Sequence, residues 1–154
     1  MRAPLWLPLC LFCFAAAGVG CLRHHSAAGE SSPAGRYDRA IERAPEFAFG
    51  GIGYGGNLSP GERGFFEVFD RPGAAENFRQ IYRRGNAQAK MYALCGLHEL
   101  DPSAFEQLVA AAGSLPGEVR VMSGCIAYRR SGSEIAGMIS DGHYSDYVTS
   151  GGRR

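Results

Sequence analysis

Helix-start signals recur along the middle of this chain, and they constrain its fold more than any other sequence feature. Ser59-Pro60-Gly61-Glu62 combines an N-cap serine, a proline at the first helical position and a capping-box glutamate. Asn86 and Asp101-Pro102 are similar starts, and Ser131 with Glu134 forms a second capping box. Each signal precedes apolar residues at helical spacing, so the sequence predicts a mainly α-helical fold.

Apolar spacing and stop signals divide this region into about five short helices, which we expect to form a small bundle. The helix over 87–100 is apolar on most sides, as is typical of a helix in the middle of a bundle. The five run from Ser59 to before Pro72, from Pro72 to Arg84, from Ala87 to Leu100, from Asp101 to Gly113 and from Ser131 to Gly142.

Two short β-prone runs interrupt the helical pattern before the last helix. Val119–Met122 and Cys125–Tyr128 are separated by Ser123-Gly124, and a two-residue turn containing glycine favours a hairpin near 119–128. An irregular extended strap pinned by Cys125 is the alternative. The sequence thus predicts a mainly α domain with one short β-hairpin.

An apolar run near the start of the sequence predicts export. Leu5–Ala17 follows a positively charged start and is shorter than the about 20 apolar residues that a membrane-spanning helix needs. Gly18-Val19-Gly20-Cys21 resembles a bacterial lipobox, in which the cysteine receives a diacylglycerol and becomes the mature N-terminus. We therefore expect a signal peptide over 1–20 and lipidation at Cys21. Ordinary cleavage after Ala17 and an uncleaved anchor are the alternatives.

The remaining chain is expected to hold a single folded domain. Residues 21–45 are rich in Ser, Ala, Gly and Arg and predict a flexible tether, in which a short amphipathic turn around Tyr37–Ile41 docks on the domain. Residues 46–148 form the predicted helical domain, and 149–154 a frayed tail. This organisation places the protein in the cell envelope, either lipid-anchored or, after ordinary cleavage, secreted or periplasmic.

Charge and motif patterns argue against nucleic acids and nucleotides as ligands. The 16 basic and 15 acidic residues leave no overall positive excess that would point to nucleic acid or to an acidic membrane surface. The segment over 51–56 fits the spacing G-x-G-x-x-G, but no helix follows it directly and no βαβ unit surrounds it. We expect this segment to be a glycine-rich structural turn, and we expect no cofactor.

Cys95 and Cys125 are the two cysteines within the predicted domain, and in an oxidising compartment an even pair favours a disulfide. Such a bridge would close a loop of about thirty residues and stabilise the fold by roughly 3–4 kcal/mol. One alternative is a metal site that adds His98 and His143, although the spacing matches no zinc pattern. Another is a Cys95–His98 nucleophile pair, for which no orienting third group is evident.

Two resemblances add to these patterns. The stretch from 86 to 113 resembles one helical hairpin of a HEAT-like α-repeat, without the second copy that a solenoid needs. The helix Met91–Leu97 with the later Gly124-Cys125 looks like small uncharacterised exported bacterial proteins, a likeness that favours the Cys95–Cys125 bridge and implies no activity. The HEAT-like features are Ala87, Ala89, Ala93-Leu94, Gly96-Leu97 and Asp101-Pro102.

The function expected from these features is a non-catalytic interaction or structural module held at a membrane. Its partner would be an envelope or extracellular protein, contacted through an apolar patch or groove lined by Phe47, Phe49 and Tyr54. The alternatives are an enzyme and a Cys/His metal-binding protein. The enzyme would use Cys95 with His98, or acids such as Glu99 and Asp101.

Overall fold

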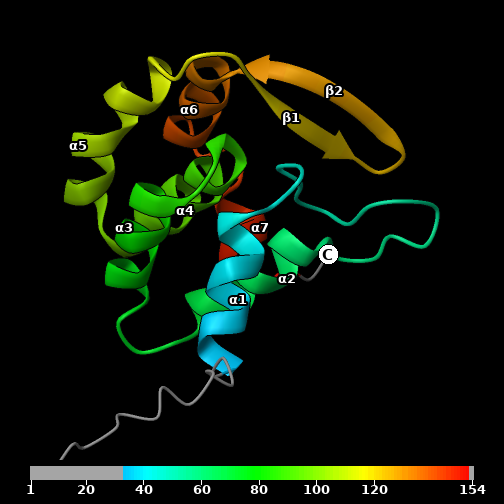
Figure 1. The fold of residues 1–154 in the computed structure, drawn as a ribbon, viewed down its shortest axis with the longest axis horizontal. Helices are drawn as coiled ribbons and strands as arrows, with labels where there is room; N and C mark the ends of the chain where they lie inside the picture. The colour runs from blue at the N-terminus through cyan, green and yellow to red at the C-terminus, as the bar shows by residue number, and fades with distance from the viewer. Residues whose placement is uncertain (1–32, 153–154) are drawn as a thin grey trace, which may run out of the picture.

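The computed structural model describes residues 33–152, and its architecture is mainly helical, as the sequence predicts (Figure 1). Within these residues there are seven helices, six of which pack around the buried α4, and a two-stranded antiparallel sheet extends from one end. The elements are α1 (Pro33–Glu42), α2 (Pro60–Phe69), α3 (Ala74–Arg84), α4 (Ala87–Leu100), α5 (Pro102–Gly113), β1 (Glu118–Ser123), β2 (Ile126–Ser131), α6 (Gly132–Ser140) and α7 (Ser145–Thr149). None of these helices is both long and apolar enough to cross a bilayer.

The helix-start signals act as expected. Ser59 Oγ accepts a hydrogen bond from the Glu62 amide at 3.0 Å, and the Glu62 carboxylate accepts one from the Ser59 amide, which completes the capping box of α2. Asn86 caps α4 through a 2.9 Å bond from the Ala89 amide. A second capping box begins α6 at Ser131. These local interactions fix where the chain enters each helix.

The folded domain begins before and extends beyond the predicted range of 46–148. Helix α1 lies within the range predicted as a flexible tether, and Ile41 and Ala44 are fully buried. The helix packs closely on α2 because Gly64 has no side chain, since a Cβ there would lie 2.9 Å from the Tyr37 carbonyl oxygen. The docking expected around Tyr37–Ile41 is thus present, as part of a longer helix, and the folded domain begins earlier than the predicted boundary at 46. Residues 1–32, which include the predicted signal peptide and Cys21, lie outside the described part.

The C-terminal segment also differs from the prediction of a tail that frays after 148. A short additional helix, α7, buries Val148 against the core. The Gly152 amide donates a 3.0 Å hydrogen bond to the Tyr147 carbonyl, so the chain stays ordered by backbone bonds up to that residue. Residues 153–154 lie outside the described part.

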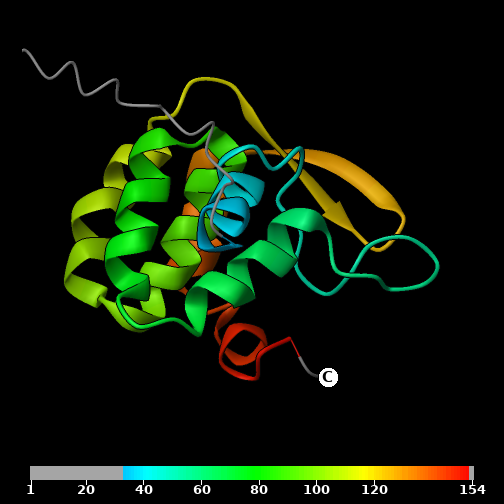
Figure 2. The ribbon, with the colours of Figure 1, turned by 60° about the horizontal axis from the view of Figure 1, so that its bottom comes forward.

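Helix α4 forms the centre of the bundle, as its apolar composition predicts. Figures 1 and 2 show α3 and α5 beside it, and α6 packs on the same helix. The approach of α3 depends on Gly96, because a Cβ at this position would lie 2.4 Å from the Phe78 ring. The buried residues of α4 lie all around the helix and are Ala89, Met91, Tyr92, Ala93, Leu94, Cys95, Gly96 and Leu97.

The predicted hairpin is present and is longer than expected. Strands β1 and β2 pair antiparallel, with Val121 opposite Tyr128. The other edge of β1 is bonded to the segment before the glycine-rich turn, since the Phe47 amide donates to the Arg120 carbonyl at 2.8 Å and the Met122 amide donates to Phe47 at 3.0 Å. The Phe47–Phe49 segment is thereby fixed against the sheet.

The glycine-rich segment over 51–56 is a turn that projects beside the tip of the hairpin (Figures 1 and 2). The Gly53 amide donates to the Gly124 carbonyl at 2.9 Å and joins the two tips. Gly51 has a φ of +80°, and a Cβ there would lie 2.4 Å from the Gly56 oxygen, so this close turn requires glycine. The structural interpretation of the G-x-G-x-x-G spacing fits this geometry.

Candidate functional site

The predicted disulfide between Cys95 and Cys125 is not formed, and both cysteines are free. Cys95 is buried in α4, whereas Cys125 is exposed at the turn between β1 and β2. The prediction rested on an even count of cysteines, and a count carries no information about where two side chains lie in the fold. The stapled bundle expected from the sequence is corrected to a bundle held by packing and hydrogen bonds.

The Cys95–His98 pair lacks the arrangement of a nucleophile and its base. Burial, and to a lesser extent the nearby Glu99 carboxylate, raises the pKa of the Cys95 thiol, so the thiol stays protonated and weakly nucleophilic. Glu99 stands between a hydroxyl and an imidazole: it accepts from Ser145 Oγ at 2.6 Å, and its carboxylate contacts His98 Nδ1 at 2.7 Å. A catalytic triad needs the imidazole in that central place. The space that these residues line has no room for a water molecule.

The proposed metal ligands are not brought together. Among residues 33–152, no three His, Cys, Asp or Glu side chains gather in a way that would hold an ion. His98 packs edge-on against Phe105, with ring centres 4.9 Å apart, and His143 packs against Tyr144 at 5.0 Å. Both histidines therefore make aromatic contacts in place of metal coordination.

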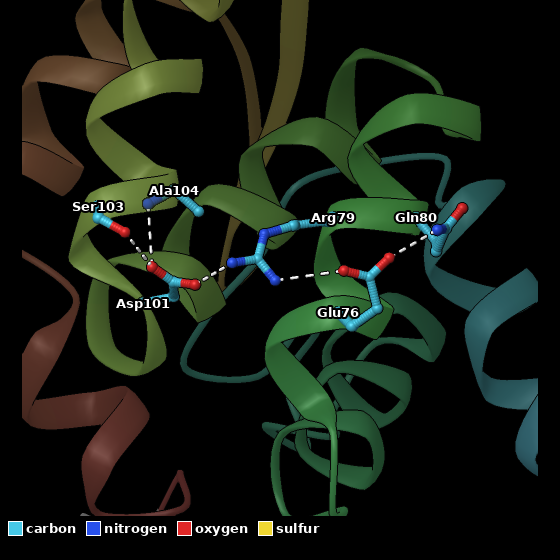
Figure 3. A network of polar contacts seen from close by, with 6 residues as sticks. All are labelled: Glu76, Arg79, Gln80, Asp101, Ser103 and Ala104. Carbon is cyan, nitrogen blue, oxygen red and sulfur yellow. Dashed lines mark hydrogen bonds and ion pairs between the residues drawn. The ribbon is translucent and has the colours of Figure 1, made fainter.

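Asp101, a candidate acid, is a structural residue at the start of α5 (Figure 3). Its carboxylate accepts from the Ala104 amide at 3.0 Å, and this bond, followed by one from the Ser103 hydroxyl, lowers the pKa of Asp101. In Figure 3, Arg79 of α3 lies between Asp101 and Glu76 and pairs with both. The network joins α3 to the α4–α5 junction and leaves the carboxylate committed to capping.

A fully buried carboxylate, Glu62, forms the densest polar site in the described chain. Besides the Ser59 amide of the capping box, it accepts hydrogen bonds from the Gly50 amide at 2.7 Å, from the Gly51 amide at 3.3 Å and from the Tyr147 hydroxyl at 2.8 Å. The sequence identified Glu62 as a cap only. Its other partners come from the glycine-rich turn and α7, which local sequence patterns cannot connect.

Tyr92 extends this polar site on the other side of the same segment. Its hydroxyl accepts from the Ala48 amide at 2.9 Å and lies 2.8 Å from the Ala48 carbonyl, to which it donates. Ser59 Oγ lies 3.3 Å from the same hydroxyl. Burial raises the pKa of Tyr92, which keeps the hydroxyl neutral and able to donate. Together, Glu62 and Tyr92 fix the backbone of residues 48–51.

An aromatic pocket opens on the other side of this fixed segment, between the hairpin and the C-terminal helices. Its volume is about 140 Å³. Phe47, Phe49 and Tyr144 meet in the wall with ring centres 5.4 to 5.6 Å apart, the spacing of favourable aromatic contacts. The lining residues are Phe47, Phe49, Val121, Met122, Ser123, Tyr128, Met138, His143, Tyr144 and Tyr147.

The pocket combines aromatic rings with polar groups, and most of its accessible lining is polar. Burial raises the pKa of Tyr144, so its hydroxyl stays neutral. The Arg130 guanidinium lies over the Tyr128 ring at 5.3 Å from its centre and brings a positive charge beside the hairpin wall. Ser123 and His143 add polar groups to the lining. Such a lining suits a ring that also carries a polar substituent.

The groove predicted from the sequence is therefore present in part. Phe47 and Phe49 line the aromatic pocket, whereas Tyr54 is fully exposed at the glycine-rich turn and does not line it. Tyr128 and Tyr144 complete the walls, and neither was predicted to belong to the site. The sequence offered a signal for Tyr128 in the β-prone run around 128. Its pairing with Val121 places both side chains on the pocket side of the hairpin.

Comparison with protein-family models, curated proteins and solved structures gives no match for this chain. Helices α4 and α5 do pack on each other, as in the HEAT-like hairpin expected for residues 86–113. That likeness, and the likeness to exported bacterial proteins, stay predictions. Any function must therefore be argued from the geometry of this chain.

Proposed function

We propose that this protein is an exported, lipid-anchored binding module without catalytic activity, and that the aromatic pocket holds one six-membered ring of an envelope ligand. The observation that carries the proposal is the pocket itself, with walls formed by Phe47, Phe49, Tyr128 and Tyr144. Preformed pockets in which aromatic side chains are combined with a few placed polar groups are typical of small-ligand sites. The ring would belong to a partner protein or to an envelope component of the same chemistry.

The size and the walls of the pocket together select a ring. A cavity of about 150 Å³ holds one benzene molecule in a protein interior, which is close to the about 140 Å³ available here. Aromatic walls favour a flat guest, because edge-to-face contacts contribute roughly 0.5–1.5 kcal/mol per pair beyond the burial of area. Ser123 and His143 provide polar partners for a hydroxyl on the guest.

The polar clusters elsewhere support a non-catalytic role. The Cys95 thiol is buried and protonated, Glu99 is already hydrogen-bonded to Ser145, and Asp101 caps α5. Each group is thus occupied by a structural interaction and faces no cavity of substrate size. Binding through the aromatic pocket requires none of them.

The binding proposal is tested by NMR titration with p-cresol, the side-chain analogue of tyrosine, against 4-methylcyclohexanol, which has similar size but no aromatic ring. We expect p-cresol to shift the ring signals of Tyr128 and Tyr144 and the saturated analogue to bind at least tenfold more weakly. Tyr128→Ala removes one wall and abolishes binding. The matched control is Tyr54→Ala, which removes an exposed tyrosine outside the pocket and leaves binding unchanged. Equal loss in both variants would contradict the proposal.

Export and anchoring are tested separately, by intact mass of the natively expressed protein from membrane and soluble fractions. A membrane species that begins at Cys21 and carries added acyl mass is expected. A soluble species that begins earlier would contradict the lipid anchor and leave the pocket proposal standing. The two parts of the proposed function thus succeed or fail independently.

A further inference from the structure

A second cavity, larger than the aromatic pocket, lies between the first turns of α1 and the start of α2. Its volume is about 280 Å³, and it shares no lining residue with the aromatic pocket. Leu58 is one of the few large apolar side chains that are exposed, with 36% of its surface accessible. The lining residues of this N-terminal groove are Arg36, Tyr37, Ala40, Leu58, Pro60 and Arg63.

The surface around the N-terminal groove is positively charged. At 100° per residue, Arg36, Arg39 and Arg43 fall on the exposed side of the α1 turns, whereas Asp38 and Glu42 fall on another flank. Asp38 pairs with Arg71 at 3.4 Å, so its charge is compensated. Within residues 33–152, Arg36, Arg43 and Arg63 form no ion pair with an acidic side chain.

We propose that the N-terminal groove binds the headgroup and glycerol region of anionic phospholipids, so that the domain rests on the bilayer through α1 and the start of α2. The arginines match the negative phosphates, and the apolar floor accommodates the carbon backbone of the lipid. An arginine cluster near an anionic membrane gains roughly 1 kcal/mol per residue, which corresponds to about fivefold in affinity each. The attraction is screened by salt.

The position of the groove in the chain agrees with this occupant. Eleven residues lie between Cys21 and Pro33, the first residue of α1, and even a fully extended chain over these twelve steps reaches only about 40 Å. A lipid on Cys21 would therefore hold α1 close to the membrane surface and raise the local lipid concentration at the groove. This step rests on the anchoring part of the proposed function and is independent of ring binding at the aromatic pocket.

Two tryptophan variants report which surface meets the bilayer. Leu58→Trp places the probe in the groove, and Leu100→Trp places it at the end of α4, where the native leucine is similarly exposed at 40%. The sole natural tryptophan, Trp6, lies in the predicted signal peptide and is absent from the processed chain. The processed protein is reconstituted into vesicles of phosphatidylcholine alone, or mixed with phosphatidylglycerol, with brominated acyl chains as quenchers.

We expect strong quenching of Leu58→Trp in phosphatidylglycerol vesicles, little in phosphatidylcholine alone, and little for Leu100→Trp in either. Adding Arg36→Gln and Arg63→Gln to Leu58→Trp should remove the additional quenching that phosphatidylglycerol causes. Arg83→Gln with Arg84→Gln removes the same charge from the exposed end of α3 and should leave it unchanged. Equal quenching at 58 and 100, or no dependence on phosphatidylglycerol, overturns the proposal.

A second measurement separates this proposal from the lipid anchor. If the mass analysis shows no acyl group, the soluble processed chain is sedimented with the same vesicles. Binding to phosphatidylglycerol vesicles that weakens about 25-fold in the Arg36→Gln, Arg63→Gln variant supports the groove without the anchor. Absence of binding to either vesicle overturns the groove, whatever the result for anchoring.

Discussion

The segment from Phe47 to Gly51 has two sides that differ in their contacts: polar groups on one side are fully hydrogen-bonded, whereas the other side borders an open pocket. On the inner side, Glu62 and Tyr92 bond the backbone of residues 48–51, and both side chains are fully buried. On the outer side, the Phe47 and Phe49 rings border the open aromatic pocket. The one buried side-chain nitrogen or oxygen without a partner among the described residues is Nε of Arg130, and it lies on this outer side.

This difference indicates a division between support and recognition. Buried polar networks in which every member is bonded hold a unique conformation, because any displacement leaves a group unpaired at a high free-energy cost. The inner side therefore fixes the wall of the pocket before a ligand arrives, which reduces the ordering cost of binding. If the comparison holds, substitutions on the inner side lower the free energy of unfolding, and substitutions on the outer side alter binding.

The strongest test of this division is Glu62→Ala. The variant leaves three amides and the Tyr147 hydroxyl without their acceptor, and an unpaired buried polar group costs roughly 1–3 kcal/mol. We expect the free energy of unfolding in urea to fall by about 4 kcal/mol. Glu67→Ala, an exposed position on the same helix, is the control and should change it by less than about 0.5 kcal/mol. Similar losses of unfolding free energy in both variants would show that the hydrogen bonds to Glu62 do not specially stabilise this segment.

A pair of matched tyrosine variants sharpens the comparison. Tyr92→Phe removes a hydroxyl that bonds both backbone groups of Ala48, and it should lower the free energy of unfolding by about 2 kcal/mol. Tyr144→Phe removes a hydroxyl that donates a weak hydrogen bond to Met138 Sδ at 4.0 Å, and it should change stability at pH 7 by less than about 0.5 kcal/mol. Urea denaturation measures both. Equal effects would show that the two sides are supported alike.

The pH dependence of stability gives a smaller effect on the outer side. Burial raises the pKa of Tyr144 above its value of about 10 in the unfolded chain, so folding favours the neutral phenol. The corresponding stability is complete below pH about 10 and is lost as the pH rises through the folded pKa. Unfolding curves between pH 9 and pH 11 should therefore show a shallower loss for Tyr144→Phe than for the native protein. If stability falls with pH equally in both proteins, groups other than Tyr144 cause the loss of stability at alkaline pH.

The sequence predicts those parts of the fold that depend on neighbours along the chain. Ser59, Asn86 and Ser131 cap the predicted helices because a cap and its partner lie within three residues. The apolar character of α4 likewise predicts its central place. For α1 the sequence predicts only the docking turn at Tyr37–Ile41, because few of its residues are apolar, although these residues lie on one side and pack against Gly64 of α2.

The candidate site depends on contacts that no local pattern contains. Phe47 and Phe49 were identified from their alternation with glycine, but Tyr128 and Tyr144 join them only when the hairpin and the C-terminal helices fold over the same segment. The disulfide prediction failed for the same reason. Counting cysteines left Cys95 and Cys125 as an even pair, whereas the fold buries one in α4 and exposes the other at a turn.

The last prediction concerns the chemical reactivity of these two thiols, which is measured without any change in the stability of the protein. Cys125 lies at the exposed tip of the hairpin, and burial protects Cys95 and keeps it protonated. Iodoacetamide should therefore label Cys125 in the native protein and Cys95 only in urea, with each site resolved by mass spectrometry of the digest. In Cys125→Ser, labelling of Cys95 in native conditions should stay absent. Native labelling of Cys95 would show that the packing of α4 against α6 and α7 opens readily, and protection of both thiols until reduction would restore the disulfide.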